Sequence, residues 1–365
     1  MSRTFDLVYA TSRLRVELAD GADLSRTLAF LGTHFRAEEL SPAEEPLATL
    51  HVSALRAAER DETSDPDDAA GEPIYVRKSA SPFFTIEANR VRNPDGTETV
   101  VCTRAGTRLR FDPQARRIEV TVSAEGWLDV VELVRDLILR DQENRGAVVL
   151  HATAAAHDGG VVLVSGSKGA GKSTILLELV EHFGYRVLSG DKALVVEGPN
   201  GIVVQGWPDY PHLGYATITK FDGLPAIAGI DPEASAPEGH AFSPFNKYAV
   251  DPVGFRERFP SAEPDDRWVP VAILEPAIGP GEATRVQPIV ESAEERVRGL
   301  DANDESPFDG THAGWIRFVP DLRAAQRERR ARILAALATV PAWRVDGPGD
   351  LVDLPFVTPR HPAHA

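Results

Sequence analysis

Cysteine and long apolar runs are scarce in this sequence of 365 residues. Because Cys102 is the single cysteine, an intrachain disulfide and a cysteine-rich metal site are both excluded. No apolar run reaches the ~18 residues that a membrane-spanning helix needs. Charged side chains interrupt the stretch from Met1 to Val16, which argues against a signal peptide. We therefore expect a cytoplasmic protein that does not enter a membrane.

Basic charge is also in deficit. The chain has 39 Lys and Arg residues against 55 Asp and Glu residues, for a formal net charge of −16. Such a surface repels phosphate backbones and anionic lipids, so we expect no general nucleic-acid or membrane binding. A local basic pocket for one nucleotide remains compatible with this charge. The hydrophobic fraction of 42% is ordinary for a globular protein, and the length suggests two domains.

Lysine is the rarest of the charged residues, with six copies in the chain. The simplest reason for so many arginines and so few lysines is a coding bias. Three of the six, Lys168, Lys172 and Lys192, nevertheless fall between positions 168 and 192. Against that background, their grouping indicates a place where primary amines are needed.

The first 144 residues are predicted to form a β-rich α+β domain. A helical period marks residues 24–35. Segment 56–73 holds seven acidic and almost no large apolar residues, which is typical of a surface loop. Apolar and β-branched runs typical of strands occur at residues 5–16, 47–52, 83–86, 100–103 and 118–122.

A second domain is expected over residues 145–345, with a C-terminal tail at 346–365. A helical period at residues 127–139 would lead into it. Two apolar runs at 147–156 and 161–164, separated by a short glycine-containing segment, predict a β-hairpin. Further strands are predicted at 185–188, 194–196, 202–205, 271–274 and 284–290, and a helix at 321–337. Pro288 lacks a backbone N–H, so the strand at 284–290 is expected at a sheet edge.

The most specific pattern in the chain is a phosphate-binding loop. Residues 166–173 read Gly-Ser-Lys-Gly-Ala-Gly-Lys-Ser, which fits the P-loop pattern G-x-x-x-x-G-K-[ST] between a predicted strand and a predicted helix. Glycines let successive backbone N–H groups face phosphate oxygens, and the start of the helix adds partial positive charge. The predicted nucleotide-binding residues are Gly166, Ser167, Lys168, Gly169, Ala170, Gly171, Lys172, Ser173 and Thr174.

The reaction depends on side chains in and beyond this loop. Lys172 would bridge the β- and γ-phosphates, and Ser173 would bind Mg²⁺. Asp191 follows the next predicted strand, where such folds hold Mg²⁺ or activate a hydroxyl; an ordinary Gly-Asp turn is the alternative. An antiparallel hairpin would bring His151 beside the loop, where it could contact phosphate, move a proton or have a structural role.

Several polar residues further along the chain could serve the same site. Each also has a plainer interpretation as a capping residue, a surface side chain or part of a solvated helix face. Lys192 could reach the phosphates or point to solvent, and Lys247 could bind phosphate or the acceptor. The acids and the histidine could line the acceptor side, and the arginines could stabilise transferred charge. These candidates are Lys192, Asp209, His212, Asp222, Lys247, Arg256 and Arg258.

The segment from Val149 to Val196 resembles the HPr kinase/phosphorylase family and its kinase-only relatives. The resemblance rests on Leu150-His151-Ala152, the hairpin, the loop, and the run 185–191 that ends in Asp191. It implies a P-loop domain on a mixed sheet related to that of phosphoenolpyruvate carboxykinases. It also implies transfer of the γ-phosphoryl group of a nucleotide to a serine hydroxyl on a protein.

The resemblance implies roles for four residues. His151 would handle phosphate or a proton, Lys172 would bind phosphate, Ser173 would bind Mg²⁺, and Asp191 would be a base or a metal ligand. The chain departs from the family in having Gly190-Asp191 instead of two adjacent acidic residues, and Val203 in a signature segment that is acidic in the family. In the family, that segment serves the reverse, phosphorylase reaction and the recognition of HPr as the protein substrate. The resemblance therefore implies neither a phosphorylase activity nor HPr as the substrate of this chain.

We therefore expect an α/β nucleotide-binding domain behind a β-rich α+β domain. It would be an ATP- and Mg²⁺-dependent kinase acting on a hydroxyl, with Asp191, His151 and Lys172 as catalytic residues. The acceptor would be a Ser or Thr of a protein or peptide, neutral or basic near its hydroxyl, with a small molecule as an open variant. The alternative is a nucleotide-binding regulatory module or slow ATPase without an acceptor, which the single Asp and the apolar Val203 favour. A homo-oligomer is compatible with either.

Overall fold

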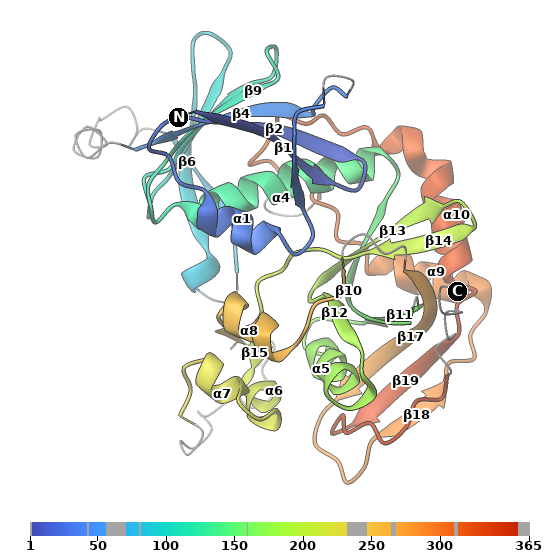
Figure 1. Cartoon of the computed structure of the whole chain (residues 1–365). Coiled ribbons are helices and arrows are strands. Elements are labelled where there is room, and N and C mark those ends of the chain that lie inside the picture. The colour runs from blue at the N-terminus through green and yellow to red at the C-terminus, as the bar shows by residue number, and fades with distance from the viewer. Residues whose placement is uncertain are drawn as a thin grey trace. The chain divides into compact units, whose positions relative to one another are not determined.

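The protein is a mixed α/β protein with two large mixed sheets (Figure 1). The computed structural model describes residues 2–41, 44–55, 71–79, 82–158, 160–231, 247–263, 268–309 and 313–356. The chain divides into two compact units, Met1–Arg145 with Ser306–Leu322, and Gly146–Glu305 with Arg323–Ala365. Residues 306–322 therefore cluster with the first unit, whereas the sequence placed them in the second.

The first unit is built on one sheet with the order β3-β1-β2-β4-β9-β8-β7-β6-β5. Strand β4 pairs in parallel with both β2 and β9, and the other neighbours are antiparallel. Its strands are β1 (Arg3–Tyr9), β2 (Ser12–Leu18), β3 (Arg36–Glu38), β4 (Ala48–Ala54), β5 (Glu72–Arg77), β6 (Ile86–Arg92), β7 (Glu98–Cys102), β8 (Arg108–Asp112) and β9 (Arg117–Val122).

Two expectations for this unit need correction. The apolar run at 5–16 is not one strand, because a turn at Ala10, with φ of 48°, folds it into the antiparallel pair β1 and β2. The run at 83–86 begins as the short 3-10 helix η2 (Pro82–Phe84), since Pro82 has no N–H to donate to a ladder. Residues 56–70 of the expected acidic loop lie outside the described residues, and Glu72 already begins β5.

Helix α4 (Trp127–Asn144) explains why residues 306–322 belong to the first unit. The sequence predicted a helix only to residue 139, but the helix continues through a charged stretch that is buried. Arg140 donates to the carbonyl oxygens of Pro307 at 2.7 Å and Ala313 at 2.8 Å, and Glu143 accepts from Ser306. Ser306, Pro307 and Ala313 thus provide hydrogen-bond partners for the buried charged side chains at the end of α4. The short helix α1 (Ser25–Leu31) also packs on α4.

Asp129, 2% exposed in the first turn of α4, carries an energetic cost. Burial raises the pKa of Asp129 to about 6, with help from Glu132, against the lowering effect of Thr107, Arg104 and Cys102. An amide of the same shape removes the cost of ionisation. We expect Asp129→Asn to raise the free energy of unfolding at pH 7.5 by about 2–3 kcal/mol, at ~1.4 kcal/mol per pKa unit.

The pH dependence of this gain has a defined sign. The folded-state pKa of Asp129 lies above its ordinary value of 3.8, so the cost is absent below that pH and complete above about 6. Urea-induced unfolding should therefore show a gain for Asp129→Asn at pH 7.5 that disappears near pH 4. An equal gain at both pH values would contradict the assignment.

The second unit is built on a sheet with the order β14-β13-β10-β11-β17-β19-β18, with β12 also paired to β10. Strands β11, β17 and β19 are mutually parallel. β18 stands at the edge, which confirms the expectation from Pro288. The strands are β10 (Val148–His157), β11 (Gly160–Ser165), β12 (Arg186–Ser189), β13 (Lys192–Gly198), β14 (Gly201–Gln205), β17 (Val269–Ile278), β18 (Arg285–Pro288) and β19 (Ala342–Gly347).

Helices cover both faces of this sheet (Figure 1). On one face, α5 (Lys172–Phe183) buries Ile175, Leu176 and Leu179 against Val162 and Val164 of β11. On the other face, α9 (Ala293–Ala302) and α10 (Arg327–Leu337) pack against the alternate strand residues. α10 is shorter than the helix predicted at 321–337, because its first part is the 3-10 turn η3 (Arg323–Gln326).

Smaller elements cover the α5 side of the sheet. The two-stranded sheet of β15 (His212–Gly214) and β16 (Lys247–Ala249) joins α6 (Tyr215–Lys220), α7 (Leu224–Ile227) and α8 (Pro252–Arg258). The start of the expected tail also packs here. Leu351 donates its N–H to Glu178 at 3.1 Å, and Leu354 and Phe356 lie against the core, while residues 357–365 fall outside the described residues.

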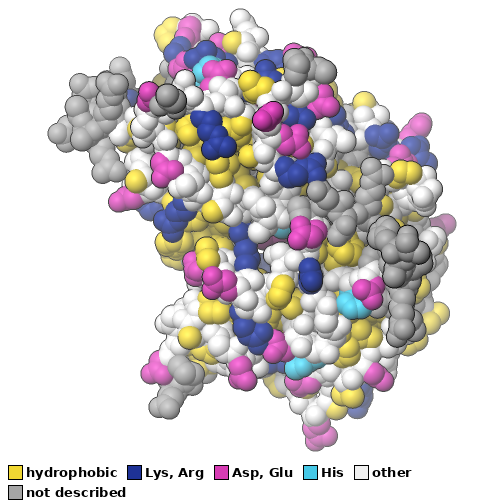
Figure 2. Space-filling model, in the orientation of Figure 1, with side chains coloured by type: hydrophobic (Ala, Val, Ile, Leu, Met, Phe, Trp, Pro, Cys, Tyr) yellow, Lys and Arg dark blue, Asp and Glu magenta, His cyan; other side chains and the backbone are white. Residues whose placement is uncertain are grey.

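Acidic and basic side chains are intermingled on the face drawn in Figure 2. For the described residues on that face, any concentration of positive charge is therefore local. Within the described ranges, no helix is both long enough and apolar enough to span a membrane.

Candidate functional site

The loop between β11 and α5 has a backbone that depends on glycine. Gly171 has φ of 103°, and a Cβ there would lie 2.3 Å from Ile278 Cγ1 at the end of β17. The N–H of Ile278 also donates to the carbonyl of Ala170 at 2.8 Å. The loop is thereby held against β17, while Ser167, Lys168 and Gly169 at its crest are exposed.

Lys172, the first residue of α5, is 7% exposed and reaches back into this loop. Its Nζ donates to the carbonyl oxygens of Gly166 at 2.9 Å and Ser167 at 3.1 Å. Burial lowers the pKa of Lys172 to about 8, and the charge of Lys247 lowers it further, while Asp191 and Glu305 oppose the shift. The amine is thus held under the loop by neutral carbonyls and is still mostly charged at neutral pH.

His151 lies where the predicted hairpin should bring it. β10 and β11 pair with Ala152 opposite Ser165, so His151 stands beside the start of the loop. On its other side it is paired with Lys192 of β13. Its Nε2 is 3.4 Å from Asp191 Oδ1 and its Nδ1 is 3.3 Å from Glu305 Oε1. The imidazole therefore lies between two carboxylates.

Asp191 is presented by a turn that Asp209 holds in place. Asp209 Oδ2 accepts hydrogen bonds from the backbone N–H groups of Gly190 at 3.2 Å and Asp191 at 3.0 Å. Of the two interpretations open for Asp209, the structure supports the capping residue. The side chain of Asp191 itself is 52% exposed, so it remains accessible.

The charge of Asp191 is stabilised by its neighbours. Partial desolvation by the surrounding residues acts to raise the pKa of this half-exposed carboxyl, but the hydrogen bond from His151 and the charges of Lys192 and Lys247 hold its pKa well below the ordinary value. Asp191 is therefore an anion at neutral pH. A carboxylate with such a low pKa orients a proton donor better than it removes a proton.

Glu305 is a member of this cluster that the sequence analysis missed. It follows α9 in a segment that pairs with the start of β10: the N–H of His151 donates to Asn303 O, and the N–H of Glu305 donates to Val149 O, both at 2.8 Å. Its carboxylate contacts His151 Nδ1 and the amine of Lys192. No local motif marks this position, since only the pairing with β10 brings it to the loop.

Four of the six lysines act on the same site. Lys192 lowers the pKa of Asp191, and Lys247 on β16 acts on both Asp191 and Lys172. Burial lowers the pKa of Lys247, and Lys168 lowers it further, whereas Asp191 opposes the shift. The grouping that the sequence suggested for three lysines thus extends to a fourth from a distant segment.

Other predicted residues have different surroundings. The hydroxyl of Thr174 is bound to that of Thr217 in α6 at 2.8 Å, and Ser173 is half-buried in the first turn of α5. Arg258 pairs with Glu181 at 2.7 Å, and His212 Nδ1 lies 3.0 Å from the carbonyl of Tyr210. Within the described ranges, no three His, Cys, Asp or Glu side chains converge as a metal site.

We call the group of Lys172, His151, Asp191, Lys192 and Glu305 the loop cluster. It combines a buried amine, Lys172, and a half-buried one, Lys192, with two partly exposed carboxylates. Amines beside a loop of backbone N–H groups suit a phosphorylated ligand, and a carboxylate beside imidazole suits a hydroxyl. The chain matches no protein-family model, and no curated protein is significantly similar to it. The loop cluster is therefore interpreted from its own geometry and chemistry.

Proposed function

We propose that this protein is an ATP- and Mg²⁺-dependent kinase that transfers the γ-phosphoryl group to a hydroxyl, a Ser or Thr of a protein or peptide. The observation that carries the proposal is that Lys172, under a glycine-rich loop, shares one cluster with the His151–Asp191 pair. The resemblance to HPr kinase-like enzymes supports the same assignment. Use of ATP agrees with a cytoplasmic location.

The residues 166–174 would act as a P-loop. Residues 167–169 at the crest are exposed, and their backbone N–H groups together with the start of the twelve-residue helix α5 would favour an anion there. Lys172 would exchange its two loop carbonyls for β- and γ-phosphate oxygens, because a charge-assisted contact with phosphate is stronger than one with a neutral carbonyl. Lys168 would add charge at the exposed crest.

The reaction joins the acceptor oxygen to the γ-phosphorus and breaks the bond between that phosphorus and the β,γ-bridging oxygen, which leaves with ADP. Asp191 would orient the acceptor hydroxyl and receive its proton as the new bond forms. A carboxylate of low pKa is sufficient for this role, since phosphoryl transfer has a loose transition state in which positioning matters most. His151 would stand beside the γ-phosphate and keep Asp191 ionised.

The side-chain oxygens near the loop are of the kinds that bind Mg²⁺. Ser173 is half-buried at the start of α5, and the Asp191 carboxylate is half-exposed, so a hydroxyl and a carboxylate oxygen are both accessible. Mg²⁺ bound with the nucleotide would be held by these two residues and would offset negative charge on the phosphates. Glu305 would supply the second carboxylate that the Gly190-Asp191 sequence lacks.

The alternative is a regulatory module or slow ATPase without an acceptor. It is favoured by the contacts that both carboxylates, Asp191 and Glu305, already make with His151, which leave fewer of their oxygens for an acceptor. In that case water would take the place of the acceptor hydroxyl, and the loop cluster would serve nucleotide binding alone.

Transfer of labelled phosphate separates the two functions. The intact protein would be incubated with γ-labelled ATP, Mg²⁺, and either cell lysate or hydroxyl-containing peptides, beside the Lys172→Ala variant. Label on a specific acceptor, absent with the variant, is expected of the kinase. ATP hydrolysis that no acceptor changes, and that Asp191→Asn leaves intact, would instead establish the ATPase.

Nucleotide affinity should depend on the charge of Lys172. Because the pKa of Lys172 is about 8 in the free protein and phosphates bind the charged amine, affinity should be constant below that pH and fall above it. The decline should approach tenfold per pH unit. Calorimetric titration with a non-hydrolysable ATP analogue between pH 6.5 and 9.5 measures it, with Lys172→Ala as the control whose weak residual affinity should stay level. A level profile for the intact protein would contradict the proposed contact.

A further inference from the structure

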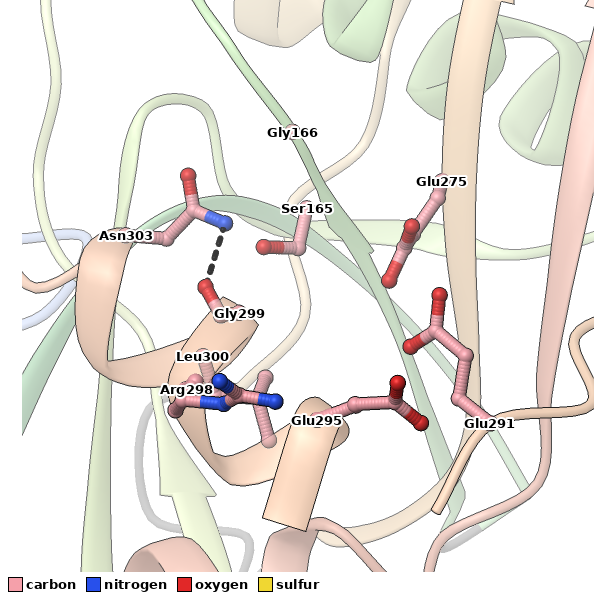
Figure 3. Close-up of a pocket in the computed structure, with 9 residues that line it drawn as sticks. All are labelled: Ser165, Gly166, Glu275, Glu291, Glu295, Arg298, Gly299, Leu300 and Asn303. Atoms are coloured by element: carbon pink, nitrogen blue, oxygen red, sulfur yellow. Dashed lines mark hydrogen bonds between the residues drawn. The ribbon is translucent and has the colours of Figure 1, made fainter. Parts of the chain in front are cut away.

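A second site lies on the opposite face of the sheet from Lys172. A cavity of about 470 Å³ lies between the ends of β11 and β17 and the helix α9. Figure 3 shows the residues that line it. This acidic pocket is lined by Ser165, Gly166, Glu275, Glu291, Glu295, Arg298, Gly299, Leu300 and Asn303. Its volume falls within the ~300–1,000 Å³ of typical small-molecule sites.

Negative charge predominates in the lining. The carboxylates of Glu275, Glu291 and Glu295 point toward one another in Figure 3, and Arg298 is the one cation among the lining residues. Burial raises the pKa of Glu275, and the charge of Glu291 raises it further, while Arg344 and Arg296 act in the opposite direction. A cation in the pocket would relieve the repulsion between these carboxylates.

The strongest indication of a ligand is the hydroxyl of Ser165. This residue is 3% exposed, and its Oγ has no hydrogen-bond partner among the described residues. Figure 3 shows the hydroxyl directed into the space between β11 and α9. A buried hydroxyl without a partner costs free energy that a ligand with N–H groups would recover.

We propose that the acidic pocket binds a guanidinium or alkylammonium group. Such a group donates several N–H bonds, which the carboxylates of Glu275 and Glu291 and the Ser165 hydroxyl can accept. Glu295 adds negative charge, while its Oε2 already accepts from the N–H and hydroxyl of Ser292 at the start of α9. The cavity is far larger than a bare metal ion requires, and an anion would meet the glutamates. The source is either a free small amine or guanidine, or a basic side chain of a peptide, which the test distinguishes.

The pocket is joined to the loop cluster by two residues. Gly166 lines the pocket and begins the glycine-rich loop, and its carbonyl accepts from Lys172. Asn303 lines the pocket and its carbonyl accepts from the N–H of His151. A cation held here would therefore lie at the same end of β11 as the loop cluster. Binding itself does not depend on the proposed kinase function.

Calorimetric titration of the intact protein without nucleotide tests the pocket. The probes are agmatine and putrescine as free cations, and short peptides that contain arginine or, as a neutral match, citrulline. The variant is the double substitution Glu275→Gln and Glu291→Gln. The control is Glu282→Gln, which replaces one exposed glutamate between β17 and β18, outside the residues that line the pocket. A second variant, Ser165→Ala, removes only the hydroxyl.

Saturable binding of agmatine or putrescine, or of the arginine peptide alone, is expected at millimolar concentrations or below. Affinity should fall about tenfold or more in the double variant, fall less in Ser165→Ala, and be unchanged in Glu282→Gln.

Preference for the arginine peptide over agmatine would identify a peptide side chain as the source of the cation. The reverse preference would identify a free small molecule. The inference is overturned if no probe binds saturably, if citrulline binds as well as arginine, or if the double variant binds as the intact protein does. If the probes bind but the experiment with labelled ATP shows no phosphoryl transfer, the cation site is supported and the proposed kinase function is not.

Discussion

Lys172→Ala is expected to weaken nucleotide binding strongly, with the Kd of MgATP rising about 100-fold or more, because two charge-assisted contacts with phosphate are lost. The amine is already held inside the loop by the carbonyls of Gly166 and Ser167, so it needs little rearrangement to meet the phosphates. The alanine variant also leaves those carbonyls without their donor. Calorimetric titration measures the change in Kd.

The matched control for this change is Lys78→Ala, which removes an exposed lysine from the first unit. The Kd of the control should equal that of the intact protein. Far-ultraviolet circular dichroism checks that Lys172→Ala remains folded. Retention of affinity in a folded Lys172→Ala protein would refute the assignment of the loop to nucleotide binding.

Asp191→Asn is expected to lower kcat for phosphoryl transfer by about 10²–10⁴-fold, because the amide neither orients the acceptor hydroxyl as an anion does nor accepts its proton. The affinity for MgATP should change much less than kcat at saturating Mg²⁺, because Asp191 acts on it in two opposite ways: its charge opposes phosphate binding next to Lys172 and Lys247, and its oxygen would help to hold Mg²⁺. The amide keeps the shape of the side chain, and the turn remains held by Asp209. Single-turnover rates and Kd, measured separately, report the two effects.

Two further measurements make this prediction specific. Asp353→Asn changes an exposed carboxyl of the C-terminal segment and should leave kcat unchanged. A titration with Mg²⁺ tells the two roles of Asp191 apart. If the residue mainly holds the metal, the variant will need more Mg²⁺ and will recover activity at high concentration; if it mainly orients the hydroxyl, no concentration restores the rate. An unchanged kcat at every Mg²⁺ concentration would remove Asp191 from the site.

Features that depend on neighbours along the chain could be predicted from the sequence. The hairpin of β10 and β11, the helix that follows the loop and the place of His151 beside the start of the loop all came from short apolar runs and the spacing between them. The edge position of β18 followed from Pro288, which lacks an N–H for a further strand. These properties are local, because alternation and helical period are imposed by the backbone geometry of a few adjacent residues.

Contacts between segments that are distant along the chain leave no such pattern in the sequence. Glu305 reaches His151 only because the chain after α9 pairs with β10, and Asp209 reaches the Asp191 turn from beyond β14. Likewise, residues 306–322 return to the first unit because they satisfy the buried charges of α4. An isolated acidic residue in a turn looks the same in the sequence whether it is solvated or bonded. The loop and its nearest partners could thus be recognised from the chain alone, whereas the second carboxylate, the fourth lysine and the acidic pocket exist only where packing and strand pairing bring separate segments together.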